Sequence, residues 1–328
     1  HKFMKLYLKA FCLLLILAAC NDSNTKQVYK PQSSGNINDL SVVIDNDLWD
    51  VSVGETIRST IGAPLYGLPQ DEAQFTLRQI PSSVFSGFVK NTRLILKIRK
   101  GIAAATKFYK DPYASPQRMV MVSGMTNQEI SEQLITNQDK IVKAFKRQEI
   151  QEKQRRTKKS LFNSTAISKQ LGINIQFPSI YRLANQSDNF FWVRRDIKTG
   201  TVNLLLYTLP YTKNITKEAL AKRVIKVRDS IGKQYIPGPV DGSYMTTEKA
   251  YTPFFGETKI ANLNSFETKS IWQVKDAFMS GPFINYWIED KTNERYLIVE
   301  GFVYAPSVGK RDYIFELEAI IQSISIKQ

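Results

Sequence analysis

Short stretches in which apolar and polar residues alternate recur along this chain, and this pattern most constrains its fold. In residues 93–100, Leu94, Leu96 and Ile98 point one way, and most of the residues between and beside them are charged (Arg93, Lys97 and Arg99). Residues 173–177 alternate in the same way. A period of two residues indicates β-strands with one buried face. We predict further strands at residues 40–44, 75–78, 118–123, 190–194, 202–207, 245–247, 271–274, 283–288 and 296–304.

Four segments have the apolar spacing of helices, of which one follows Asp47 and the other three lie later in the chain. Thr126 and Glu129 predict a capping box at the start of a long helix, whose apolar residues continue at helical spacing to Ile150. Thr216 is the predicted cap of a second helix, and a third begins near Arg311 and continues toward residue 326.

Aspartates near the start of the first half are candidates either for a calcium site or for helix capping. Asp45, Asp47 and Asp50 lie close together, but an EF-hand loop that began at Asp45 would need Gly at its sixth position and Glu at its twelfth. Those positions hold Asp50 and Thr56. We therefore predict that Asp47 caps a helix that ends at Gly62, and we expect no metal site.

The order of these segments predicts an α+β protein with two domains. Each domain is expected to be an antiparallel sheet packed by helices, and a long basic helix is expected to join them. We place the N-terminal domain at residues 39–165, with the long helix at its end, and the C-terminal domain at residues 166–328.

The end of the long helix is strongly basic. Residues 146–159 contain seven basic and two acidic side chains and few apolar ones. One interpretation is a solvated helical extension between two domains. The alternative is a contact patch for an anionic lipid or glycan.

The first residues have the pattern of a signal sequence. Lys5 and Lys9 precede an apolar run at residues 11–19, which is too short to span a bilayer. The sequence Leu17-Ala18-Ala19-Cys20 resembles the lipobox of bacterial lipoproteins. That resemblance implies a signal peptide at residues 1–19, cleavage before Cys20 and acylation of its sulfur. Residues 20–38 would then be a flexible tether. An ordinary secretory signal is the alternative.

Two residue types that many catalytic sites need are nearly missing from the chain. The one histidine is His1, and the two cysteines are Cys12 in the predicted signal and Cys20 at the predicted lipid. A Ser-His-Asp triad, a Cys-His pair and a His-ligated zinc are therefore excluded from the predicted mature chain. The nucleotide-binding patterns G-x-x-x-x-G-K-[ST] and G-x-G-x-x-G do not occur in the sequence either. We expect no cofactor.

The formal net charge of +15 favours anionic partners. These include lipid head groups, polyanionic glycans and acidic faces of envelope proteins. Nucleic acid fits the charge but does not fit an exported lipoprotein, so we expect no nucleic-acid partner.

Candidate binding residues are aromatic and arginine side chains that lie next to each other or near Gly/Pro-rich loops. They are Trp192, Arg194, Arg195, Tyr235, Tyr244, Tyr304 and Arg311. The alternative is structural: a strand with alternate residues in the core and its arginines in water, and tyrosines that cover the end of a sheet.

The second half resembles the sandwich fold of PsbP and Mog1-like proteins. The similar features are an opening strand that ends in Phe177-Pro178, a hairpin, a central helix, a later hairpin and a closing amphipathic helix through residues 323–326. Members of that group are mostly binding or assembly factors, so the resemblance implies binding rather than catalysis.

The whole chain resembles an uncharacterised lipoprotein family of the Bacteroidota, which implies lineage but no activity. The similar stretches are residues 67–70, 191–196, 236–239, 242–245, 281–283, 301–306 and 310–312. Surface-exported lipoproteins of that group often carry an acidic run after the cysteine. Here Asp22 is the only acidic residue among residues 21–24, so we expect an outer-membrane protein that faces the periplasm.

Together these patterns predict a membrane-anchored envelope lipoprotein that binds or scaffolds an anionic or protein partner without catalysis. The alternative is a carboxylate-dependent hydrolase of an envelope polymer. Asp196, Asp241, Glu289 and Asp290 are acidic candidates for it, but their spacing does not single out a pair.

Overall fold

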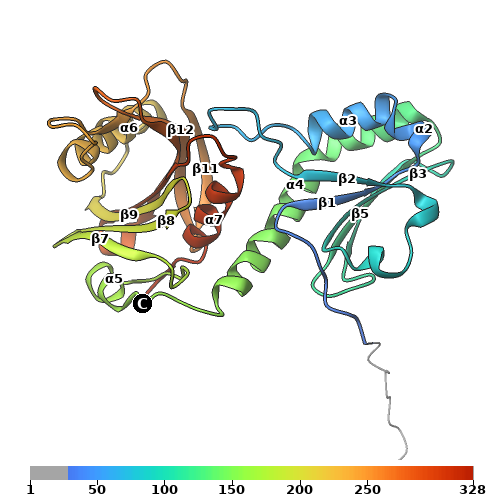
Figure 1. The fold of residues 1–328 in the computed structure, drawn as a ribbon, viewed down its shortest axis with the longest axis horizontal. Coiled ribbons are helices and arrows are strands. Elements are labelled where there is room, and N and C mark those ends of the chain that lie inside the picture. The colour runs from blue at the N-terminus through green and yellow to red at the C-terminus, as the bar shows by residue number, and fades with distance from the viewer. Residues whose placement is uncertain (1–28, 328) are drawn as a thin grey trace, which may run out of the picture. The chain divides into compact units, whose positions relative to one another are not determined.

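The N-terminal domain contains a five-stranded sheet covered on one face by helices (Figure 1). The computed structural model describes residues 29–327. The strands lie in the order β2-β1-β3-β5-β4. Their bounds are β1 Asp39–Val43, β2 Thr76–Ile80, β3 Leu94–Lys100, β4 Ala105–Lys110 and β5 Arg118–Gly124.

The prediction that this sheet is antiparallel is wrong. β1, β2, β3 and β5 are paired in parallel, and only β4 runs antiparallel to its neighbour β5. The connections explain the difference. Residues 44–75 and 81–93 are long enough to return the chain to the same end of the sheet, whereas residues 111–117 form the hairpin that joins β4 to β5.

Two short helices replace the single helix that we expected from Asp47 to Gly62. They are α2 Asn46–Trp49 and α3 Ser52–Thr60. The backbone is extended at Val51, so the helix is interrupted there. A Cβ atom at Gly54 would collide with the carbonyl oxygen of Trp49, which shows how closely α2 and α3 approach each other.

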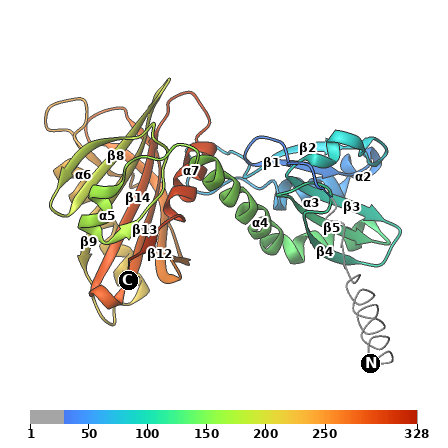
Figure 2. The same cartoon turned by 90° about the horizontal axis from the view of Figure 1, so that it is seen from below.

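The long helix is α4 Asn127–Thr157, and its predicted start is confirmed. The Thr126 hydroxyl accepts a hydrogen bond from the Glu129 amide at 3.2 Å, and the Glu129 carboxylate accepts one from the Met125 amide at 2.8 Å. Ile130 and Phe145 lie on the buried side of α4, in the core between this helix and the sheet. Figure 2 shows α4 running from β4 and β5 toward the C-terminal domain.

The C-terminal domain is built on an antiparallel eight-stranded sheet, as expected. The order is β10-β12-β13-β14-β9-β8-β7, and β11 also pairs with β12. The bounds are β7 Arg182–Ser187, β8 Phe190–Ile197, β9 Gly200–Pro210, β10 Met245–Thr247, β11 Phe254–Ile260, β12 Leu263–Val274, β13 Ser280–Asp290 and β14 Arg295–Tyr304.

Helices cover both faces of this sheet. Along β9, Leu204 and Leu206 contribute to one core and Leu205 and Tyr207 to the other. The first core lies under α5 Thr165–Leu171 and α7 Arg311–Ile321, and the second lies under α6 Lys217–Tyr235. The α+β class and the two-domain organisation are confirmed.

The chain end departs from the predicted helix. α7 ends at Ile321, and β15 Ser325–Ile326 pairs instead with β6 Ile173–Asn174. Ile324 lies after the end of α7 and is buried in the same core as Ile320 and Ile321. The apolar residues therefore continue past the helix because the chain stays buried there, although it is no longer helical. Three short 3-10 helices complete the described elements: η1 Ser82–Val84, η2 Gly87–Asn91 and η3 Lys291–Asn293.

A loop of the N-terminal domain fastens onto the C-terminal domain. Leu68 is buried in the C-terminal core beside α7. The Glu72 carboxylate accepts hydrogen bonds from the amides of Lys310 and Arg311, at 2.7 and 2.9 Å, at the start of α7. Gln154 of α4 donates to the carbonyl of Ala319 at 2.9 Å, so α7 is held from both directions.

Candidate functional site

The predicted binding residues do not converge on one place. Trp192, Tyr235 and Tyr304 pack against the core beneath α6. The Trp192 indole donates to Asn203 Oδ1 at 3.0 Å, and the Tyr235 ring stacks on Phe190 with 4.0 Å between centroids. These three aromatic side chains therefore contribute to packing on the sheet.

The two arginines of β8 point to opposite faces of the sheet. Arg194 pairs with Asp196 on its own strand at 2.7 Å. Arg195 lies under α7, where it pairs with Glu316 at 3.2 Å and its guanidinium lies 5.7 Å from the centre of the Tyr313 ring. Arg195 thus connects β8 to α7.

Tyr244 and Arg311 are separate from those residues. The ammonium groups of Lys233 and Lys275 both lie over the Tyr244 ring, at 5.7 and 5.6 Å from its centre. Arg311 donates to the Ala73 carbonyl at 3.1 Å and so holds the N-terminal loop. As binding residues, all seven stay a prediction.

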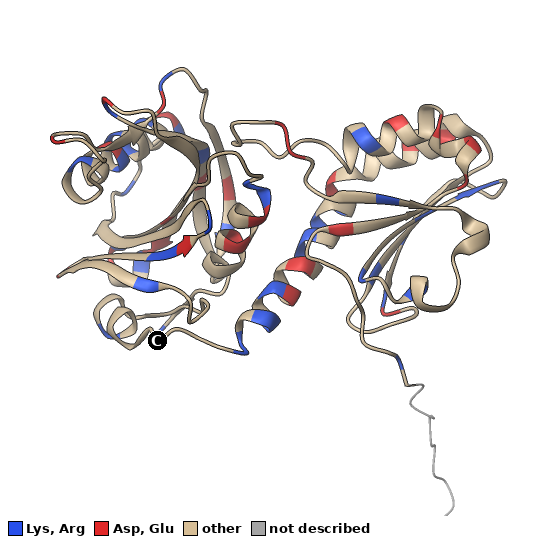
Figure 3. Ribbon diagram, in the orientation of Figure 1, with Lys and Arg blue, Asp and Glu red and all other residues tan. Residues whose placement is uncertain are grey.

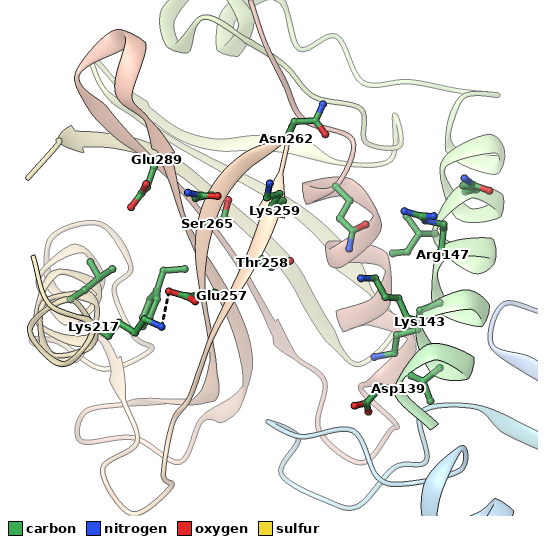
Figure 4. Close-up of a pocket in the computed structure, with 18 of the residues that line it drawn as sticks. Asp139, Lys143, Arg147, Lys217, Glu257, Thr258, Lys259, Asn262, Ser265 and Glu289 are labelled. Carbon is green, nitrogen blue, oxygen red and sulfur yellow. Dashed lines mark ion pairs between the residues drawn. The ribbon is translucent and has the colours of Figure 1, made fainter. Parts of the chain in front are cut away.

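A groove of about 1300 Å³ lies between α4 and the β11–β12 hairpin (Figure 4). One side is a single face of α4, with Asp139, Lys143, Lys146 and Arg147 at helical spacing. The other side includes Lys259 of β11 and Lys217 of α6. Figure 4 shows the α4 side chains directed toward the strands across the groove.

The groove has an excess of positive charge. Five cations line it, against the three carboxylates of Asp139, Glu257 and Glu289. Glu257 is neutralised by Lys217 at 3.0 Å, and Glu289 by Lys291 at 3.0 Å. Within residues 29–327, no ion pair engages Lys143, Arg147 or Lys259, which leaves a cationic surface available on both walls.

The basic run at residues 146–159 is cationic on its exposed side because its two acidic side chains are buried. Both basic and acidic residues occur along the C-terminal half of α4 (Figure 3). Glu149 and Glu152 are buried on the opposite side of α4, where they face Arg93. Because the two acids point inward, the exposed side is more basic than the sequence composition of the run. Residues 146–159 are therefore partly buried and not a purely solvated extension.

The pKa of the Glu152 carboxyl reflects this packing. Burial acts to raise its pKa, but hydrogen bonds from Arg155 and Arg156 and the nearby charge of Arg93 outweigh burial and lower the pKa to about 2. Glu152 therefore stays ionised and holds the arginines that follow it on the helix.

The buried carboxylates among the described residues are held in ion pairs, which fits structural roles. They are Glu149, Glu152, Asp290, Glu300, Glu316 and Glu318. Burial raises the pKa of Glu300, and Arg228, whose Nε lies 3.0 Å from its Oε1, opposes that rise. Glu300 does not line the groove.

The described residues offer neither a cluster of metal ligands nor a membrane-spanning helix. Across residues 29–327, no three His, Cys, Asp or Glu side chains are grouped so that they could hold a metal ion. In the same part of the chain, no helix has both the length and the apolar character needed to cross a bilayer. Cys20 lies outside the described residues.

Sequence reasoning identified the basic helix but missed its partner wall. Lys259 lies on β11, a strand that was not predicted because Phe254–Ile260 lacks a clear two-residue period. The one usable signal was the spacing of Asp139, Lys143 and Arg147, which places all three on one face of a helix.

The fold and the groove define a two-domain α+β protein with a cationic groove beside its connecting helix. Residues 160–323 match the family described as "Domain of unknown function (DUF4837)", and residues 33–158 match "Domain of unknown function (DUF8532)". The chain belongs to the DUF4837 family. The two matches meet near the end of α4 and agree with the two-domain organisation.

Comparison with other proteins adds little. None of the curated proteins matches the chain. The Ran-binding protein Mog1p of Saccharomyces cerevisiae shows 10% identity and a TM-score of 0.32, over 47% of this chain and 90% of its own. LpqN of Mycobacterium tuberculosis, which is involved in cell envelope biogenesis, shows 11% sequence identity and a TM-score of 0.30. The match covers 48% of this chain and 83% of LpqN. These scores carry no inference about function.

Proposed function

We propose that this chain is a membrane-anchored envelope lipoprotein that binds an extended anionic polymer in the groove between α4 and β11, without catalysing a reaction. The polymer is an acidic glycan or an acidic protein segment of the envelope. The lipid on Cys20 would hold the protein at the outer membrane, facing the periplasm.

The observation that carries the binding proposal is the pair of cationic walls. Lys143 and Arg147 on α4 face Lys259 on β11 across the groove, and none of the three has an ion-pair partner among residues 29–327. Unpaired cations on two facing walls attract an anion from both sides. Apolar side chains between them, such as Val142 and Phe266, offer contacts for a polymer backbone.

The length of the groove favours a polymer over a small molecule. Its α4 wall runs from Asp139 to Gln154, which corresponds to about 22 Å at the rise of an α-helix. A single small anion would contact only one turn of that wall. An extended chain with several negative charges would contact Lys143, Arg147 and Lys259 together.

Binding to defined polymers tests the proposal. The probes are fluorescent poly-glutamate and dextran sulfate, with neutral dextran for comparison. The variant Lys143→Gln/Arg147→Gln/Lys259→Gln removes three groove charges. The matched control Lys198→Gln/Lys213→Gln/Lys226→Gln removes three exposed lysines that do not line the groove.

We expect the groove variant to bind the anionic probes about tenfold more weakly, because each exposed charge contact contributes a fraction of a kcal/mol up to about 1 kcal/mol. Added salt should weaken binding of the parent protein. Equal losses in the groove and control variants would mean that net charge alone attracts the polymer, and the groove proposal would be abandoned.

The lipid anchor has a separate test in cells. Cys20→Ala should abolish incorporation of a radiolabelled or clickable fatty acid and move the protein out of the membrane fraction. Cys12→Ala is the matched control and should keep both properties, because Cys12 lies within the predicted signal. Unchanged labelling of the Cys20→Ala chain would reject the anchor.

The alternative of a carboxylate-dependent hydrolase has no specific support from the groove. Glu257 and Glu289 each pair with a lysine, and Asp139 is on the opposite wall, on α4. A general acid needs a carboxyl that holds its proton near neutral pH. Release of reducing ends or peptides from envelope polymers by the purified chain would revive this alternative.

A further inference from the structure

The face of the N-terminal sheet opposite α3 and α4 is covered only in part, by the segment of η1 and η2, whose Phe85 and Val89 pack on Ile95 and Met119. Lys97 of β3, Met121 of β5 and Lys107 of β4 are neighbours in the strand register, so they share this partly covered face. Leu94, Leu96 and Ile98 of β3 point to the opposite face and lie in the core beneath α4. In Figure 1 the teal segment that holds η1 and η2 lies on the side of the sheet away from α3.

Four cations gather on or beside this face. They are Lys90, Lys97, Arg99 and Lys107, and no ion pair neutralises them within residues 29–327. The ammonium groups of Lys97 and Lys90 lie over the Phe85 and Tyr113 rings, each 5.4 Å from the ring centre. Burial, followed by the charges of Arg99 and Lys90, lowers the pKa of Lys97. Burial is the larger cause, and the two neighbouring cations lower the pKa further.

The same side of the domain exposes large apolar side chains. Phe88 on η2 is 91% exposed and Val84 on η1 is 55% exposed. The neighbouring Phe85 is buried against the sheet. An exposed phenylalanine beside lysines is the combination that inserts at a lipid–water interface, where the ring enters the boundary region and the cations meet phosphate groups.

The chain that comes from Cys20 joins the domain next to η2. The Ser34 amide donates to the Asn91 carbonyl at 2.9 Å, and the Ser34 carbonyl accepts from the Arg93 amide at 3.1 Å. Ser34 follows Cys20 by 14 residues, which reach at most about 50 Å when fully extended. A lipid on Cys20 would therefore keep η2 within reach of the bilayer surface.

We propose that this side of the N-terminal domain, with the exposed Phe88 of η2 and Val84 of η1 and the cations Lys90, Lys97, Arg99 and Lys107, docks on the anionic phospholipid surface of the membrane. The inference rests on the proposed anchoring through Cys20. Docking would present the N-terminal domain to the bilayer by a face that the polymer groove does not use, since none of these six residues lines the groove.

The test attaches the lipid chemically, so that it does not depend on acylation in cells. In a full-length Cys12→Ser chain, Cys20 is the only thiol. It is coupled to a maleimide lipid in vesicles of phosphatidylcholine and phosphatidylglycerol. Phe88→Trp places an indole on η2, and Phe278→Trp is the matched control because Phe278 is a fully exposed phenylalanine of the C-terminal domain. Brominated lipids then quench any indole that enters the bilayer.

We expect brominated lipids to quench the emission added by Phe88→Trp by about half, because an interfacial ring lies about 5–10 Å into the boundary region. The emission added by Phe278→Trp should not change. Equal quenching at the two positions, or no quenching at position 88, would overturn the docking proposal and leave the groove proposal untouched.

Charge variants identify the anion. Lys97→Gln/Arg99→Gln/Lys107→Gln should shift the docking equilibrium by about fivefold for each cation removed, and only in vesicles that contain phosphatidylglycerol. The same Lys198, Lys213 and Lys226 substitutions serve as the control. Retained quenching in the Lys97, Arg99 and Lys107 variant would contradict the proposal. So would tight binding of soluble dextran sulfate through these residues without quenching in vesicles, because the face would then bind a polymer.

Discussion

Arg93 and Glu149 form a buried ion pair that joins the start of β3 to α4, with 2.5 Å between Arg93 Nε and Glu149 Oε1. Their side chains are 1% and 0% exposed. Arg93 also donates to the carbonyls of Gly35 and Asn36, and Glu149 accepts from the Asn38 amide. The pair therefore fixes the segment before β1 as well as the long helix.

Loss of one partner should be costly. Arg93→Met would leave the Glu149 carboxylate buried without its partner, and we expect the free energy of unfolding to fall by about 3–5 kcal/mol. Urea denaturation measures this change. Arg182→Gln is the control, because Arg182 forms an exposed pair with Asp196 and should cost less than about 1 kcal/mol. A loss below 1 kcal/mol for Arg93→Met would show that the buried pair is dispensable.

Glu152 should contribute to acid sensitivity. Its pKa is about 2 in the folded protein against an ordinary value of 4.5, so the ionised form stabilises the fold above about pH 4.5. That contribution is lost as the pH falls from 4.5 toward 2. Glu152→Gln should therefore be less stable than the parent near neutral pH, and the difference should shrink through this window.

Urea unfolding at a series of pH values from about 6 down to about 2.5 checks this prediction. Glu132→Gln is the matched control, because Glu132 is an exposed carboxylate on the same helix. Parallel stability curves for the Glu152→Gln chain and the parent would show that Glu152 does not cause the acid sensitivity.

Leu68 should couple the two domains. It comes from the N-terminal loop but is buried in the C-terminal core. Leu68→Ala should leave a cavity there and lower the free energy of unfolding by about 2–4 kcal/mol. Leu161→Ala is the control, since Leu161 is 44% exposed and should change stability by less than about 0.5 kcal/mol. Similar small effects for both variants would mean that Leu68 does not seal the core.

Trp192 and Arg194 stay candidates for a protein contact on β8. Within residues 29–327, the only ion-pair partner of Arg194 is Asp196 of the same strand, and the Trp192 side chain is partly exposed. Trp192→Ala/Arg194→Ala should reduce recovery of a binding partner from envelope extracts several-fold, because such residues often dominate interfaces. Lys198→Ala/Lys213→Ala is the control. Equal recovery of every partner would remove β8 from the candidate surfaces.

Much of the local structure followed from the sequence alone. The capping residues Thr126 and Thr216 each start a helix where expected. The two-residue period of Leu94, Leu96 and Ile98 does mark a buried strand face. These features depend on contacts within a few residues, and their physical basis is the geometry of one helix turn or one strand.

Only the tertiary structure decided which elements meet. The parallel direction of β1, β2 and β3 depends on the path of long connections, which residue alternation does not encode. The cationic groove depends on Glu149 turning inward to Arg93, more than 50 residues away, and on Lys259 arriving on an unpredicted strand. The sequence by itself determined where most of the helices and strands form and how basic the chain is, whereas long-range packing decided which charges are buried and which remain exposed.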